Sequence, residues 1–129
     1  MGLDMYMMGV TNGILSKEDK NAGKVYDQSE LELGYWRKYH SLHRYIVDEF
    51  ADGEDVCQRI DLEKEELQQI LESESAIDVE EMKRDVGDGE EFEWWLFAHN
   101  NTLSVLKKAI EWIGVDGDGW NSVYYQASW

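Results

Sequence analysis

Three histidines are the residues of this chain whose type and spacing first suggest chemistry. His40 and His43 are three positions apart, which places both on one side of a helix, and His99 lies in the apolar stripe of a second helical segment. If the two segments meet, three imidazoles and a nearby carboxylate would suit a metal such as zinc. The simpler interpretation is that His43 and His99 pack in an aromatic core, since the sequence shows no acidic partner for either. Packing is favoured, and a metal-dependent enzyme using His40, His43 and His99 stays the alternative.

Other motifs of enzymes and cofactor sites are missing from the sequence. The stretch 116–119, Asp-Gly-Asp-Gly, resembles the beginning of a calcium loop, but Ala127 stands where that loop needs a bidentate Glu, so we interpret the stretch as a turn. The single cysteine, Cys57, cannot form an internal disulfide and lies near acids, which do not favour a thiolate. No phosphate-binding or dinucleotide-binding glycine motif is present. We therefore expect no enzyme activity, no cofactor and no metal, and a reducing cytoplasm fits the single cysteine best.

Negative charge is the most prominent chemical feature of the chain. Its 12 Lys and Arg residues against 28 Asp and Glu residues give a formal net charge of −16. Between Asp61 and Glu93, fourteen acids stand against Lys64, Lys83 and Arg84, so this third of the chain contributes −11. Such a surface repels nucleic acid and anionic membranes, and it attracts basic proteins at a rate that falls with salt. The expected partner is a host protein with a basic surface.

Carboxylates held on helices can imitate the phosphates of a nucleic acid in a groove lined by Lys and Arg. Acids on a solvated helix face can also do no more than keep a protein in solution. An inhibitor can instead recognise its target through an aromatic anchor, and acidity alone does not separate these modes. The residues expected to contact the partner are six acids and one tryptophan beside an apolar stripe: Glu65, Glu66, Glu72, Asp78, Glu80, Glu81 and Trp94.

Strands are predicted at both ends of the chain. Residues 3–10 are rich in large apolar side chains and stop at a turn sequence, and residues 120–129 contain a Val-Tyr-Tyr run. A third, short strand is predicted within 25–33 from the alternation of Leu31 and Leu33 before Gly34. The polar stretch 16–24 is predicted to be a loop.

Helices are predicted between these strands from three- and four-residue periodicity. The first covers 35–52, with Trp36 and His43 on its apolar stripe. The second begins after Asp61 as N-cap, with Leu62, Leu67, Ile70 and Leu71 on its buried face, and a short helical piece follows at 77–86. The third main helix covers 92–113, includes His99 and ends at Gly114.

The whole chain, 1–129, is predicted to form a single α+β domain. Its 129 residues, 43% of them hydrophobic, suffice for one core, and no proline, repeat or long linker divides them. We expect a small antiparallel sheet from the two chain ends, packed with three main helices. The early acid Asp4 and the lack of a long apolar stretch predict neither a signal peptide nor a membrane span.

Three motifs resemble those of a group of small phage and prophage proteins. They are Met-Gly-Leu-Asp-Met-Tyr at the start, Gly-Tyr-Trp-Arg-Lys at 34–38 with His43 downstream, and Tyr-Tyr-Gln-Ala-Ser-Trp at 124–129. The group carries an apolar segment containing Phe and Gly in the middle of the chain, where this sequence is acidic at 78–93. The resemblance implies a phage or mobile-element origin and supplies no activity, cofactor or catalytic residue.

Charge and resemblance together predict a phage-encoded acidic binding protein in the host cytoplasm. It would inhibit or modulate a host nucleic-acid-binding protein, in the manner of an anti-CRISPR or anti-restriction protein and with nucleic-acid mimicry as one mode. Besides the metal-dependent enzyme, a structural protein that self-associates through its aromatic surface is the other alternative.

Overall fold

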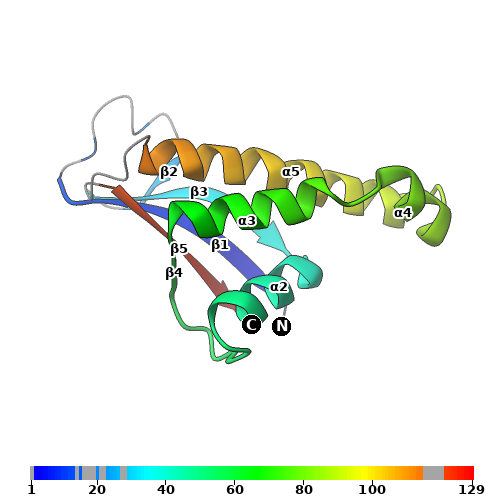
Figure 1. Cartoon of the computed structure of the whole chain (residues 1–129), viewed down its shortest axis with the longest axis horizontal. Coiled ribbons are helices and arrows are strands. Elements are labelled where there is room, and N and C mark those ends of the chain that lie inside the picture. The colour runs from blue at the N-terminus through cyan, green and yellow to red at the C-terminus, as the bar shows by residue number, and fades with distance from the viewer. Residues whose placement is uncertain (1, 14, 16–19, 21–22, 27–28, 115–120) are drawn as a thin grey trace.

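The computed structural model describes residues 2–13, 15, 20, 23–26, 29–114 and 121–129. Within these residues the strands form one antiparallel sheet in the order β2-β3-β1-β5-β4 (Figure 1). The strands are β1 (Asp4–Thr11), β2 (Lys24–Val25), β3 (Glu30–Arg37), β4 (Ile60–Leu62) and β5 (Asn121–Ser128). The two ends of the chain pair along β1 and β5, with Met5 opposite Ala127, as the sequence predicts.

Helices lie on one face of this sheet, and one of them extends past its end, which confirms the predicted α+β fold (Figure 1). In the described residues they are α2 (His40–Phe50), α3 (Lys64–Ser75), α4 (Val79–Val86) and α5 (Glu90–Ile113). Helices α3 and α5 run side by side, and α5 contacts β1, β3 and β5 (Figure 1). The long predicted helix 92–113 is therefore confirmed as α5, and the short piece at 77–86 as α4.

The core lies between the sheet and α5, and strand alternation decides which side chains enter it. Met5 and Met7 of β1 are fully buried, and so is Tyr125 of β5. Helix α5 crosses β3 so closely that a Cβ added at Gly34 would collide with the side chain of Val105. A glycine at position 34 is therefore what allows α5 to pack against the sheet.

The first predicted helix began too early in the sequence. Residues 35–37 continue β3, with Arg37 paired to Asp4 of β1, and α2 begins only at His40 after Lys38 takes a positive φ of 62°. Trp36 therefore lies on a strand, where its indole donates a hydrogen bond to the Thr102 hydroxyl at 2.8 Å. Trp36 and Tyr39 are three residues apart and both buried, which imitates a helical stripe, but Trp36 lies on β3 and Tyr39 is the N-cap of α2.

The second predicted helix was also displaced at its start. Asp61 lies on β4 and does not cap a helix; Glu63 is the N-cap of α3. The Glu66 side chain accepts a hydrogen bond from the Glu63 backbone N–H at 2.8 Å, as in a capping box. Leu62 belongs to β4, while Leu67 and Ile70 form the buried face of α3 as predicted.

Helix α4 and the first turns of α5 extend beyond the end of the sheet (Figure 1). At its other end α5 stops at Gly114, whose φ of 88° suits glycine, as the sequence predicts. Among the described residues, no helix combines the length and the apolar composition that crossing a membrane requires. The turn predicted at 116–119, Trp120 and most of the loop predicted at 16–24 lie outside the described residues.

Candidate functional site

The acids predicted to contact a partner follow one another along α3 and α4. Glu65 and Glu72 are exposed on α3, seven positions apart and therefore on one side of the helix, and Glu66 is half-buried by its capping role. Helix α3 runs antiparallel to α5. The Lys64 amine at the start of α3 donates a hydrogen bond to the Gly114 carbonyl at the end of α5 at 3.1 Å, whereas Glu74 near the end of α3 contacts His99 further back along α5. With twelve residues α3 is about 18 Å long, so Glu65 lies far from the acids of α4.

Asp78, Glu80 and Glu81 are brought together at the beginning of α4. The Asp78 side chain accepts a hydrogen bond from the Glu81 backbone N–H at 3.2 Å, so Asp78 is the N-cap of the helix. Glu80 and Glu81 lie in its first turn, where negative charge complements the helix dipole. All three residues remain exposed. These acids therefore stabilise the start of α4 and are also accessible to the solvent.

We define the acidic arm as residues 78–97, which comprise α4 and the first turns of α5. Its first sixteen residues carry eight acids against Lys83 and Arg84, a net charge of −6. Lys83 lies 3.8 Å from Asp88 in an exposed ion pair, which neutralises little. All eight acids are exposed: Asp78, Glu80, Glu81, Asp85, Asp88, Glu90, Glu91 and Glu93.

Two exposed aromatic side chains stand among these acids on α5. Trp94 is 46% exposed, as predicted from its place beside the apolar stripe, and its ring meets Tyr39 edge-on at 6.2 Å. Phe97, which the sequence reasoning missed, is 74% exposed. The signal that could have found it was position: Phe97 is three residues after Trp94, on the same side of the helix and away from the buried Trp95. Exposed aromatic side chains with polar neighbours are a feature that many protein-binding surfaces share.

One acid in the charge-rich segment does not face a partner at all. Glu74 is only 5% exposed. Its Oε2 accepts a hydrogen bond from the Tyr39 hydroxyl at 2.8 Å and lies 2.7 Å from His99 Nδ1. The Trp95 ring stacks on the His99 ring at 4.8 Å. Burial, and then the neighbouring Glu74 carboxylate, raise the pKa of Tyr39 above its ordinary range, so its phenol stays neutral. Glu74 therefore links α3 to α5 through its contact with His99.

The three histidines do not come together. His43 pairs with Asp55 and His99 with Glu74, while His40 is exposed at the start of α2. No group of three or more His, Cys, Asp or Glu residues in the described part of the chain is placed to hold a metal ion. The ligand set of the enzyme alternative is therefore not formed by these residues.

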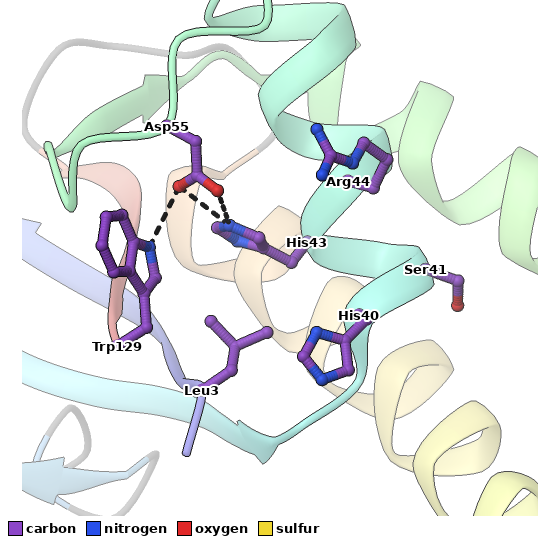
Figure 2. A pocket seen from close by; sticks show the side chains of 7 residues that line it. All are labelled: Leu3, His40, Ser41, His43, Arg44, Asp55 and Trp129. Atoms are coloured by element: carbon purple, nitrogen blue, oxygen red, sulfur yellow. Dashed lines mark hydrogen bonds and ion pairs between the residues drawn. The ribbon is translucent and has the colours of Figure 1, made fainter. Parts of the chain in front are cut away.

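A pocket of about 560 Å³ lies where the start of β1, α2 and the end of β5 meet (Figure 2). His43 Nε2 is 3.0 Å from both oxygens of Asp55, and His43 Nδ1 is 2.6 Å from the Tyr125 hydroxyl. The Trp129 indole N–H donates to Asp55 Oδ1 at 3.1 Å. The lining side chains are Leu3, His40, Ser41, His43, Arg44, Asp55 and Trp129.

A carboxylate, an imidazole and a phenol are thus hydrogen-bonded in sequence, and we call these three residues, Asp55, His43 and Tyr125, the His43 clamp. Both nitrogens of His43 are hydrogen-bonded within the protein, Nε2 to Asp55 and Nδ1 to the Tyr125 hydroxyl. Tyr125 is fully buried, and burial raises the pKa of its phenol far above the usual range. Partial burial tends to raise the pKa of Asp55, but hydrogen bonds from His43 and Trp129 outweigh it, so that pKa lies below its ordinary value.

Asp55 and Glu74 are the acidic partners of the histidines that sequence reasoning did not find. They lie 12 and 25 residues from His43 and His99, and no local pattern links such positions. The predicted packing of His43 and His99 is what the structure shows, but each histidine is hydrogen-bonded to an acid. Among the described residues, no buried side-chain N or O atom lacks a hydrogen-bond partner.

Comparisons of the chain with protein-family models, with curated proteins and with solved structures found no match in any of the three. The resemblance to phage proteins therefore rests on its three motifs, and these meet in space. Leu3 from the first motif, His43 from the second and Trp129 from the third all line the pocket of Figure 2. In the described structure the motifs serve to join the two ends of the chain to α2.

Proposed function

We propose that this chain is a phage-encoded acidic binding protein of the host cytoplasm, which inhibits or modulates a host nucleic-acid-binding protein by docking its acidic arm onto a basic surface. The observation that supports the proposal most directly is the coincidence, on one short segment, of eight exposed acids with exposed Trp94 and Phe97. Neither the clamp at His43 nor the buried Glu74 takes part in this contact.

The two kinds of side chain would contribute differently to binding. Exposed carboxylates steer a basic partner toward the arm and fit the Lys and Arg residues that otherwise hold phosphates. Glu90 and Glu93 each lie four positions before an exposed aromatic residue, Trp94 and Phe97 respectively, and so flank the aromatic pair. Aromatic side chains inserted into a partner's pocket supply most of the binding energy. The proposed mode is therefore partial mimicry of nucleic acid, reinforced by an apolar anchor.

A charge-reversal experiment with matched variants tests the proposal. The arm variant carries Glu80→Lys, Glu81→Lys and Asp85→Lys. The control variant carries Glu49→Lys, Glu54→Lys and Glu111→Lys, which change the net charge equally at exposed positions outside the arm. Each protein is used to capture partners from host lysate at low and high salt. The nucleic-acid binding of the captured protein is then measured with and without each variant.

We expect the arm variant to lose capture and inhibition by about tenfold or more, while the control variant stays within about threefold of wild type. Equal losses in both variants would mean that net charge alone matters and that the arm is not the contact. Unchanged capture with the arm variant would refute the proposal directly. Circular dichroism and the midpoint of thermal unfolding verify that both variants are folded.

A further inference from the structure

The face of the sheet opposite α5 contains a trough lined by tyrosines. Because side chains alternate along a strand, Tyr6 and Met8 of β1 point away from the face that holds Met5 and Met7, and Tyr124 of β5 points the same way. The trough has a volume of about 450 Å³, and Tyr6, Met8, Tyr26, Glu30 and Tyr124 are among the side chains that line it. Nothing in the acidic arm or the His43 clamp uses this face.

Two of the phenols that line the trough donate hydrogen bonds to carboxylates. The Tyr124 hydroxyl donates to Glu30 Oε1 at 2.9 Å, and the Tyr26 hydroxyl donates to Glu32 Oε1 at 2.9 Å. The hydrogen bond to Glu32, more than burial, raises the pKa of Tyr26, so this phenol stays neutral. The face of its ring carries the partial negative charge of an aromatic quadrupole. A cation near such a ring is attracted by the quadrupole of the ring and by the full negative charge of the neighbouring carboxylate.

Two of the chain's own cations already rest on these rings. The Arg59 guanidinium carbon lies 4.1 Å from the centre of the Tyr124 ring, and the Lys24 amine lies 5.3 Å from that of Tyr26. In the sheet register, Tyr124 stands between Met8 of β1 and Asp61 of β4, and Arg59 pairs with Asp61 at 2.9 Å. Two rings that line the trough are therefore already in contact with positive charge.

We propose that this trough binds an organic cation, namely the side chain of a lysine or arginine on a protein partner. Three tyrosines and Glu30 line the trough together with Met8, so aromatic rings and a carboxylate face the same space. A chain with a net charge of −16 draws basic proteins toward itself, which supports a protein as the source of the cation. The site is separate from the acidic arm and does not depend on the function proposed for it.

Titration by NMR with defined probes tests this site, with the methyl group of Met8 as the reporter. The cationic probes are acetyl-Gly-Lys-Gly-amide and acetyl-Gly-Arg-Gly-amide. The neutral probe is the same lysine peptide acetylated on its amine, and tetramethylammonium represents a free small cation. We expect saturable shifts of the Met8 signal with the two cationic peptides, and none with the neutral peptide.

Ring substitutions then separate recognition of the cation from a general effect of charge. Tyr26→Leu should weaken binding of the cationic peptides about fivefold, because it removes one aromatic wall, while Tyr26→Phe should stay within about twofold of wild type. Tyr6→Leu is the second wall variant. Tyr45→Leu, on α2 and outside the trough, is the control and should leave binding unchanged.

Three results would overturn the proposal. They are an equal response to the neutral peptide, unchanged affinity in both Tyr26→Leu and Tyr6→Leu, and tighter binding of tetramethylammonium than of either peptide. The last would assign the trough to a free small cation. A folded Tyr26→Leu protein is assured by the 50% exposure of Tyr26, whose side chain contributes little to the core.

Discussion

At the scale of single residues, burial and hydrogen-bonding partners separate acids that maintain the fold from acids available for binding. Glu72 and Glu74 are two positions apart on α3, yet Glu72 is exposed and Glu74 is buried against Tyr39 and His99. A buried carboxylate with two such partners cannot be removed without leaving them unpaired. Counting charges along the sequence therefore overestimates the binding surface.

Glu74→Ala should lower the free energy of unfolding by about 3–5 kcal/mol, because it leaves His99 and the Tyr39 hydroxyl buried without their partner. Glu72→Ala, at an exposed position on the same helix, should change it by less than about 0.5 kcal/mol. Urea unfolding monitored by tryptophan fluorescence measures both. Similar values for the two variants would contradict the role assigned to Glu74.

At the scale of elements, the contact of α5 with the sheet depends on a small residue at one crossing point. The backbone of β3 at Gly34 lies against Val105 of α5, and two positions later Trp36 bonds Thr102. Long apolar periodicity predicted α5 correctly, while the boundary between β3 and α2 was displaced. The difference arises because α5 has 24 residues that repeat one pattern, whereas Trp36 and Tyr39 lie where a strand gives way to a helix.

Gly34→Ala should destabilise the fold by about 1–3 kcal/mol, since the new methyl group collides with Val105 and forces α5 away from β3. Adding Val105→Ala should recover part of this loss, so the two effects should be non-additive by more than about 0.5 kcal/mol. Gly13→Ala is the control, because a Cβ there meets nothing within 4 Å and the residue is exposed outside the helices. Additive effects in thermal or urea unfolding would argue against the crossing contact.

At the scale of the whole molecule, charge is unevenly distributed over a compact fold. Residues 33–47 contain no acid and carry Arg37, Lys38 and Arg44, whereas the acidic arm has a net charge of −6 over 78–93. The arm also extends past the sheet (Figure 1), where a partner's groove can reach it. Such an arrangement orients the molecule in the field of a basic partner before contact.

Association of the chain with its captured partner should therefore slow by about tenfold or more between low and physiological salt. Trp94→Ala and Phe97→Ala should mainly raise the dissociation rate and leave the association rate nearly unchanged, because apolar anchors act after encounter. Surface plasmon resonance at several salt concentrations gives both rates. Dissociation rates that do not respond to either aromatic variant would exclude the pair as the anchor.

The sequence by itself determined the fold class, the pairing of the two chain ends, the long helix α5 and its end at Gly114. These features depend on local periodicity, on composition and on backbone preferences that neighbouring residues share. The exposure of Trp94 and of the acids at the start of α4 also followed from helical position.

Only the tertiary structure decided which acids and histidines belong together. Asp55 reaches His43 across 12 residues, Glu74 reaches Tyr39 across 35, and Tyr124 reaches Glu30 across 94. The tyrosine trough likewise combines side chains from both ends of the chain. Such pairings result from how strands and helices pack, and a sequence pattern with a period of two or of 3.6 residues carries no information about them.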